Sequence, residues 1–491
     1  MSEVKPKGKI SSSLIIAVII ALIIGIVAGY FIKPTAPPEV KTETIEKTIE
    51  KTITKTIVAT TTPTFKLPSL AGVTLTAVGP VGHPSSSAVK IAAEEFEKLT
   101  GAKIKTVEYD WADLFPKIMT DFTTHSGVYD IIIYDVTWPG AVAPYVVDLG
   151  KFRKEHPELV DPNYDMDDWV GWASICCFYG GTNIGYPLNT HTMIIEYRKD
   201  LLEDPTNKEE FKKKYGYELA PPTTWDQFRD IAEFFTGAHG CEYGVALMTK
   251  IQSANVFFNF FAPLRRSSEG IKRFGKVNPL YGDWFTEDGK PALNNEYGLK
   301  ALNYFIELLK FAPAPLESDY PEADAYFMKG KCALNIIWPT EFYPDALADP
   351  TSVVKDKTAC AVMPGWDNIY GYGTIGGQSL AINKDSKNKE AAFLFIQWMT
   401  SKEQDKINFL KAGCEPARKS TYKDPELLSK YPWLSVWGKS VETPCMRPSI
   451  PQGWDIYLIV QTHVTAALAG IETPEKALAA MESEINKLLA G

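Results

Sequence analysis

Cysteine is scarce in this sequence. The 491 residues contain seven cysteines, none of them before Cys176, and no C-x-x-C pair occurs. This scarcity excludes a dense disulfide framework, a cysteine-based metal site and a lipid anchor on an N-terminal cysteine. In an oxidising compartment two disulfides remain open as interpretations, Cys332 with Cys360 and Cys414 with Cys445.

The usual signatures of enzymes and of nucleic-acid-binding proteins are missing as well. The sequence has no H-E-x-x-H pair, no Walker lysine motif and no G-x-S-x-G, so no metal, phosphate or nucleophile site is recognisable. The net charge is -9 and no large basic block occurs, which argues against nucleic acid. We expect no cofactor, no metal and no catalysis. Carboxylates are plentiful, however, and a glycosidase needs only two, so an anchored extracellular glycoside-degrading enzyme is an alternative.

Two short stretches imitate ligand motifs without completing them. Residues 371–376 read G-Y-G-T-I-G, but a dinucleotide loop must open a helix, and residues 378–382 have the pattern of a strand. Residues 161–172 begin like a calcium loop, yet Met166 replaces the turn glycine and Trp172 the final glutamate. We interpret the first stretch as a backbone loop near a ligand and the second as a solvated acidic turn.

A long apolar run lies near the N-terminus. Residues 10–32 carry no charge, follow three lysines, and are long enough to cross the roughly 30 Å core of a bilayer. We predict that residues 1–33 form a single-pass transmembrane anchor, with the lysines in the cytoplasm and the rest of the chain outside the cell. The alternatives are a cleaved secretory signal and, because of Lys7-Gly8, a leader that resembles those of prepilins and some archaeal binding proteins.

A segment rich in threonine and proline follows the apolar run. Between residues 35 and 64 there are eleven threonines and no aromatic residue, so this segment cannot form a packed core. We predict that residues 34–70 are a stalk. Isoleucines at a period of four offer a short helix or coiled coil as the alternative, but that period drifts around a helix and threonine is a poor helix former.

From Val73 onward the pattern is that of a globular α/β protein, in which strand-like and amphipathic helical segments alternate. Residues 129–140, Y-D-I-I-I-Y-D-V-T-W-P-G, join an unbroken apolar run to a polar and aromatic end. Such a run is typical of a parallel strand covered on both faces, and these sheets bind ligands at the carboxyl ends of their strands. Tyr134, Asp135 and Trp138 are therefore candidate ligand contacts. A core strand that ends in a polar turn is the alternative.

The order of several short motifs is more informative than any one of them. These motifs are F-E-K-L-T-G at residues 96–101, Y-D-I-I-I at 129–133, G-Y-P at 185–187, Y-R-K-D-L-L at 197–202, P-P-T-T-W at 221–225, A-Y-F-M-K-G-K at 325–331 and T-P-E-K-A-L at 473–478. In this order they resemble extracellular solute-binding proteins of family 1, the maltose-binding-protein-like receptors of ABC importers. The resemblance covers about residues 73–489.

The resemblance implies a two-lobe periplasmic-binding-protein-like fold of type II, in which a mainly parallel sheet flanked by helices forms each lobe. Residues 71–187 and 362–415 would form the first lobe, and residues 188–361 and 416–491 the second. The chain would cross between the lobes near Tyr186, Val362 and Glu415. It would act as a monomer that captures a small ligand and delivers it to ABC permease subunits in the membrane.

The resemblance also extends the candidate site. Sugars present apolar C–H faces and rims of hydroxyl groups, so their pockets combine flat aromatic rings with polar side chains. We therefore expect a sugar or oligosaccharide ligand; a polyamine or another polar solute is the alternative. A core position is the competing interpretation for each tryptophan. Besides the three residues named above, the resemblance places His191, Gln252, Asn255, Trp338, Glu341 and Trp454 in the segments that form the site.

Overall fold

The computed structural model describes residues 65–250, 252–313, 318–339 and 351–491. The predicted anchor at residues 10–32, most of the predicted stalk and the candidate contact Glu341 lie outside these ranges. Within them, no helix has both the length and the apolar character needed to cross a membrane.

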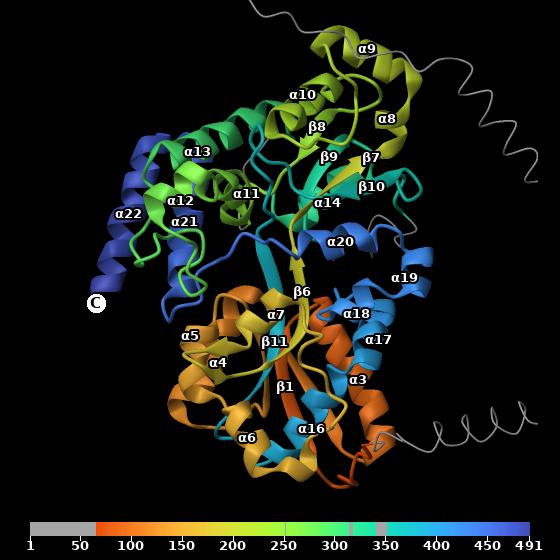
Figure 1. The fold of residues 1–491 in the computed structure, drawn as a ribbon, viewed down its shortest axis with the longest axis vertical. Coiled ribbons are helices and arrows are strands. Elements are labelled where there is room, and N and C mark those ends of the chain that lie inside the picture. The colour runs from red at the N-terminus through yellow and green to blue at the C-terminus, as the bar shows by residue number, and fades with distance from the viewer. Residues whose placement is uncertain (1–64, 251, 314–317, 340–350) are drawn as a thin grey trace, which may run out of the picture. The chain divides into compact units, whose positions relative to one another are not determined.

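The first sheet is built around β3 (Ile131–Asp135), the apolar run singled out in the sequence. Its strand order is β2-β1-β3-β11-β6, with β2 (Lys103–Tyr109), β1 (Thr74–Pro80), β11 (Ile375–Ile382) and β6 (Tyr186–Thr192). Figure 1 labels β1, β11 and β6 of this sheet. Ile131 and Ile133 belong to one buried cluster, and Ile132 to another. The prediction of a strand covered on both faces is therefore confirmed. β1 pairs in parallel with both β2 and β3, whereas β11 is antiparallel to β3 and β6.

Helices and short elements surround this first sheet. Helix α3 begins after His83, whose Nδ1 accepts a hydrogen bond from the backbone N–H of Ser85, and ends at Gly101 in the left-handed region, with a φ of 80°. The elements are α3 (Pro84–Thr100), α4 (Trp111–Thr124), α5 (Pro139–Val142), η1 (Ala143–Tyr145), α6 (Leu149–Glu155), η2 (Pro157–Leu159), α7 (Gly171–Cys176), β4 (Phe178–Tyr179), β5 (Thr182–Asn183), α16 (Lys389–Met399) and α17 (Lys402–Ala412).

The second sheet has the order β10-β7-β9-β8, with β10 (Thr358–Ala361), β7 (Ile194–Arg198), β9 (Cys332–Ile337) and β8 (Tyr243–Ala246). Here the prediction of a mainly parallel sheet is wrong, because β8 and β9 pair in parallel while β7 is antiparallel to both β9 and β10. The physical reason for the β7–β10 pair is the path of the chain. It enters this sheet along β7, directly after β6 and Met193, and returns toward the first sheet along β10, so these neighbours run in opposite directions.

The helices of the second lobe follow the amphipathic spacing of the sequence. Thr224 and Gln227 form the expected capping box at the start of α10, and Phe228 and Ile231 of that helix are buried. The elements are α8 (Lys199–Glu203), α9 (Pro205–Tyr215), α10 (Trp225–Phe235), α11 (Ser253–Arg265), α12 (Ser268–Phe274), α13 (Glu296–Leu308), η3 (Leu309–Phe311), α14 (Tyr320–Met328), α21 (Gly453–Leu468) and α22 (Pro474–Ala490).

Three short helices link α17 to α21. They are α18 (Lys419–Tyr422), α19 (Pro425–Lys430) and α20 (Leu434–Ser440), and α20 contacts β6 (Figure 1). Trp437 of α20 and Tyr422 of α18 share a buried cluster with Ile194 and Ile337 of the second sheet. This linking segment therefore packs at the place where the chain leaves β6 and enters β7.

All seven cysteines are buried free thiols. The two disulfides left open by the sequence are therefore wrong. Cys332 lies on β9 and Cys360 on β10, and β7 lies between these two strands. Cys414 and Cys445 belong to the cores of two different hydrophobic clusters. Neither pair has the adjacency that a disulfide needs.

Candidate functional site

Three parallel strands of the first sheet end beside one another, and aromatic side chains follow each of them. His83 follows β1, Trp111 begins the helix after β2, and Trp138 follows β3. The ring of Trp111 contacts those of His83 and Trp138 edge-on, with centroid distances of 5.6 and 5.9 Å. The sequence pointed to this edge through β3 alone. Applying the same rule to β1 and β2 would have found His83 and Trp111.

Asp135 is buried at the end of β3 and forms an ion pair with a distant residue. Its Oδ1 accepts hydrogen bonds from the backbone N–H and the hydroxyl group of Thr137, at 3.0 and 2.7 Å. Nη2 of Arg447, which is also buried, lies 3.2 Å from both carboxylate oxygens. The neighbouring Met446 donates its backbone N–H to Asp283, beside the core of the second lobe. The ion pair therefore connects the first sheet to a segment held by the second lobe.

Trp138 and Trp454 meet edge-on, with a centroid distance of 6.0 Å. Trp138 is completely buried, whereas Trp454 is partly exposed and packs against the cores of both lobes. Trp454 stacks on Tyr457 at 5.3 Å, and the hydroxyl group of Tyr457 accepts a hydrogen bond from Asn255 at 3.2 Å. Nδ2 of Asn255 also donates to Oε1 of Gln252. The structure thus brings these four predicted residues together through Tyr457, which the sequence did not identify.

His191 and Trp338 form a second pair, with a centroid distance of 5.0 Å. Nδ1 of His191 lies 3.2 Å from Oε1 of the buried Glu415, but the alignment of the two groups does not make this contact a hydrogen bond. Gly376 of β11 packs against this pair, because an added Cβ would lie 2.2 Å from Nε2 of His191. Residues 375–382 form β11, so the G-x-G-x-x-G sequence opens no helix.

The environment of His83 keeps its imidazole neutral. The pKa of His83 is lowered to about 4, mainly by burial and in part by His191, while the carboxylates of Glu415 and Asp135 partly oppose the shift. His83, His191, Glu415 and Asp135 therefore lie within electrostatic reach of one another. At neutral pH the imidazole of His83 is uncharged and can both donate and accept a hydrogen bond.

Residues 80–406 match the family model of bacterial extracellular solute-binding proteins. The chain belongs to this family. It is 26% identical over 410 residues to a probable amino-acid ABC transporter periplasmic-binding protein of Sinorhizobium fredii, with 82% of this chain and 86% of the relative covered. It is 24% identical over 392 residues to a mannitol-binding protein of Pseudomonas aeruginosa, with 74% and 81% covered.

Solved structures of solute-binding proteins share the two-lobe α/β fold. One from Agrobacterium radiobacter, in complex with ribitol, has a TM-score of 0.70 and 27% identity, with 86% of this chain and all of that chain covered. A maltose-bound MalE3 of T. maritima has the same TM-score and 23% identity, with 85% of this chain and all of that chain covered.

Several buried polar atoms of this solute-binding protein lack a hydrogen-bond partner within the described ranges. Unpartnered polar atoms also occur in the cores of both lobes. One group of these atoms differs from the others because it lies at or beside the candidate site. Gln378 lies opposite Asp135 across the β3–β11 ladder and opposite Asn189 of β6. The unpartnered atoms at or beside the candidate site are Nε1 of Trp138, Nδ1 of His191, Oγ1 of Thr192, Oδ1 of Asn255, Oε1 of Gln378 and Nε of Arg447. Donors and acceptors of this kind are the groups that a polar ligand satisfies.

Tyr134 lies apart from this group. Successive side chains of a strand alternate between the two faces of the sheet, so Tyr134 does not share the face of Asp135. Tyr134 is completely buried in a hydrophobic cluster, and its hydroxyl group donates to the backbone carbonyl of Cys176 at 3.0 Å. We therefore leave Tyr134 out of the set of proposed contacts.

Metal ligands do not converge in the described part of the chain: no group of three or more histidine, cysteine, aspartate or glutamate side chains there could hold an ion. In the turn that begins like a calcium loop, Asp161 and Asp165 accept hydrogen bonds from the backbone N–H groups of Asn163 and Asp167. Asp165 also pairs with Lys402 at 3.0 Å. These contacts describe a surface turn held by its own side chains.

Proposed function

We propose that this solute-binding protein is the extracellular receptor of an ABC importer and that it captures a sugar, an oligosaccharide or a related polyol without chemical change. The observation that carries the proposal is the juxtaposition of Trp138 and Trp454, together with buried donors and acceptors that have no partner among the described residues. Besides Trp138 after β3, these groups belong to His191 and Thr192 of β6, Asn255 of α11, Gln378 of β11 and Arg447. Aromatic rings cover the C–H faces of a sugar, and the polar atoms hold its hydroxyl groups. The relatives named for mannitol, ribitol and maltose support this ligand class.

An amino acid is the second candidate ligand, and the buried Asp135–Arg447 pair favours it. A zwitterion presents a carboxylate that Arg447 can bind and an ammonium group that Asp135 can bind. The relative from Sinorhizobium fredii, named as a probable amino-acid receptor, supports this alternative. A polyamine would use the carboxylates and rings alone, so three ligand classes can be compared directly.

A thermal-shift screen of the protein tests the proposal. Mannitol, ribitol, maltose, a set of amino acids and spermidine are compared, since a ligand at 100 times its dissociation constant stabilises the folded state by about 2.7 kcal/mol. We expect the shift with a sugar or polyol, recovered unaltered after incubation. A shift confined to amino acids or spermidine would contradict the sugar proposal, and product release would favour an enzyme.

Replacing Trp454 by alanine should weaken binding of the ligand found in that screen by about 5- to 150-fold, the equivalent of roughly 1 to 3 kcal/mol for an aromatic face. Trp398 of α16 is a matched control, because it is also partly exposed but packs against the core of the first lobe. Replacing Trp398 by alanine should leave the affinity unchanged. Equal losses of affinity in the two variants would remove Trp454 from the site.

We also propose that residues 1–33 anchor the protein in the cell membrane and that residues 34–64 are the stalk. The stalk was expected to end at residue 70, but Phe65, Leu67 and Leu70 pack against the core of the first lobe. The support is the uncharged run at residues 10–32 behind three lysines. The full chain should stay with membranes after alkaline carbonate extraction, and a chain without residues 1–66 should be soluble with unchanged ligand affinity. Release of the full chain by carbonate would contradict the anchor.

The lobe boundaries at 361/362 and 415/416 belong to the same proposal, as does a monomeric receptor. The boundary expected at 187/188 is moved to Met193, because all of β6 belongs to the first sheet. The chain passes from β6 to β7 through Met193 and from β10 to β11 through residues 362–374. These connections are short enough for the two lobes to close on a ligand by a hinge motion.

A further inference from the structure

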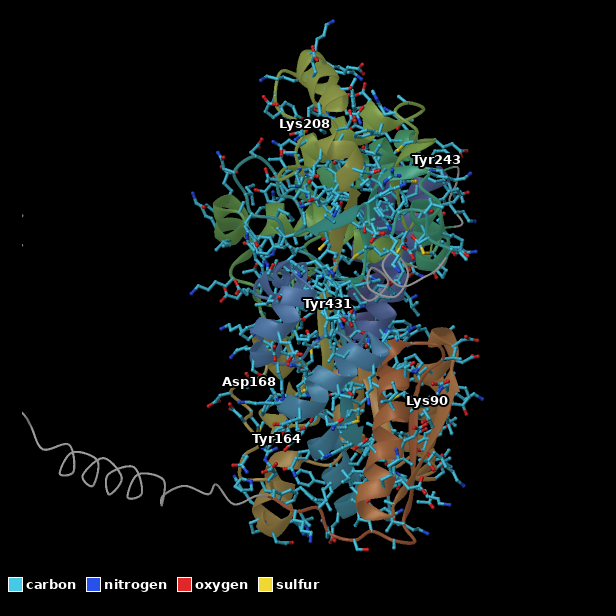
Figure 2. The ribbon with its side chains drawn as sticks, turned by 90° about the vertical axis from the view of Figure 1, so that its right-hand side faces the viewer. Lys90, Tyr164, Asp168, Lys208, Tyr243 and Tyr431 are labelled. Atoms are coloured by element: carbon cyan, nitrogen blue, oxygen red, sulfur yellow. The ribbon has the colours of Figure 1, made fainter. Side chains whose placement is uncertain are left out.

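A pocket of about 610 Å³ lies outside the candidate site, beside the segment that links α17 to α21. Its volume falls within the range of about 300 to 1,000 Å³ that is typical of small-molecule sites. Three of its lining side chains are apolar or aromatic and buried: Val170, Tyr422 and Val441. Figure 2 labels Asp168 and Tyr431, which belong to the two chain segments around this pocket. A ligand here would therefore cover an apolar surface.

The charged side chains around this surface are mainly cationic. Lys419, Lys423 and Lys439 line the pocket and are exposed, and Glu442 is the one carboxylate among the lining residues. Nζ of Lys419 donates to the backbone carbonyl of Asp167 at 2.8 Å. Among the described residues, the nearby Asp424 and Glu426 form ion pairs with Lys406, and neither Lys423 nor Lys439 takes part in an ion pair. In a chain with a net charge of -9, this local excess of positive charge favours an anion.

The pocket wall is held in place by contacts that need no ligand. The hydroxyl group of Tyr422 donates to the backbone carbonyl of Thr190 on β6 at 3.3 Å. Burial raises the pKa of Tyr422 well above its ordinary value, so the side chain stays a neutral phenol. A Cβ added to Gly438 of α20 would lie 3.2 Å from the ring of Tyr422, so a glycine lets this helix approach the ring closely. Asp168 fixes α18 by accepting from the hydroxyl group of Ser420 at 2.6 Å.

We propose that this pocket is a second ligand site and that it binds a small amphipathic anion, a carboxylate attached to a flat apolar body. The apolar body covers Tyr422 and Val441, and the carboxylate lies near Lys423 and Lys439. The two ammonium groups attract the charge, while the preformed wall lowers the entropic cost of binding. The site is distinct from the one at the ends of β1, β2 and β3, because the two share no lining residue.

Calorimetric titration of the full-length chain with 2-naphthoate tests the proposal, with 2-naphthylmethanol as an uncharged probe of the same ring. We expect one binding site for naphthoate and about tenfold weaker binding of the alcohol, the scale of two partly exposed ion pairs. The double variant Lys423→Gln with Lys439→Gln should bind naphthoate about tenfold more weakly. The matched control, Lys98→Gln with Lys411→Gln, removes two exposed lysines elsewhere and should bind normally.

Three results would overturn the proposal. They are equal naphthoate affinities of the two double variants, equal affinities for naphthoate and the alcohol, and displacement of naphthoate by the solute found in the thermal-shift screen. Such displacement would show that naphthoate binds at the candidate site at the ends of β1, β2 and β3 and not in this pocket. A Gly438→Val variant adds a test of shape, because its side chain crowds Tyr422. It should bind naphthoate at least tenfold more weakly while it melts as a folded protein and binds its solute normally.

Discussion

Replacing Trp138 by alanine should lower the free energy of unfolding by about 3 to 5 kcal/mol, the cost of the cavity that a deleted tryptophan leaves in a packed interior. The ring is completely buried and contacts Trp111, Phe115 and Trp454, with centroid distances between 5.0 and 6.0 Å. Urea denaturation at pH 7 measures the loss. The partly exposed Trp454 should cost less stability when it is replaced, because part of its ring already contacts water.

A Trp138→Phe variant separates the ring from its N–H group. Phenylalanine keeps much of the apolar volume and removes Nε1, a buried donor without a partner among the described residues. We expect a smaller loss of stability than with alanine, of about 1 to 2 kcal/mol, because the remaining cavity is smaller. If Nε1 donates to the ligand, this variant will also bind the ligand more weakly. An alanine variant as stable as the natural protein would show that Trp138 is not part of the core.

Replacing Arg447 by methionine should also lower the free energy of unfolding by about 3 to 5 kcal/mol, because Asp135 would then remain buried without its cationic partner. The two hydrogen bonds from Thr137 would remain but would not neutralise the charge. The measurement is urea denaturation at pH 7. The pair Arg273–Glu296 is a matched control, since both side chains are exposed; an Arg273→Met variant should cost less than about 1 kcal/mol.

A double variant shows whether the lost stability comes from the uncompensated carboxylate. Asp135→Asn combined with Arg447→Met removes both charges, so we expect it to regain much of the stability lost by Arg447→Met alone. A double variant as unstable as the sum of the two single variants would contradict this explanation. It would indicate that Arg447 acts through packing, for example against the ring of Tyr457, whose centroid lies 5.9 Å away.

The parts of the fold that depend on local pattern could be predicted from the sequence. The unbroken apolar run at residues 131–133 predicted a strand covered on both faces, and the capping box at Thr224 and Gln227 predicted the start of α10. The direction of β7 relative to its neighbours could not be predicted. The direction depends on where the chain passes between the two lobes. The local sequence around β7 has no pattern that indicates this path.

The candidate site shows the same division. Asp135 and Trp138 follow a recognisable strand, so the general rule for sheet edges was sufficient to find them. Arg447 lies 312 positions from its partner Asp135, in a short segment without periodic pattern. Glu415 follows α17 and approaches His191 from a distant part of the sequence. Residues of this kind are identified only when the folded chain brings distant segments together.

Because all seven thiols are buried, we expect the folded protein to react slowly with alkylating reagents. Burial raises the pKa of Cys176 to about 12 and that of Cys241 to about 11, so the reactive thiolate form is rare at neutral pH. Cys332 lies in the core that includes the second sheet, and Cys414 in the core of the first lobe. The rate at which a maleimide labels each cysteine would therefore report how often the surrounding lobe opens locally. Labelling of Cys332 and of Cys414 would measure this opening separately for the two lobes.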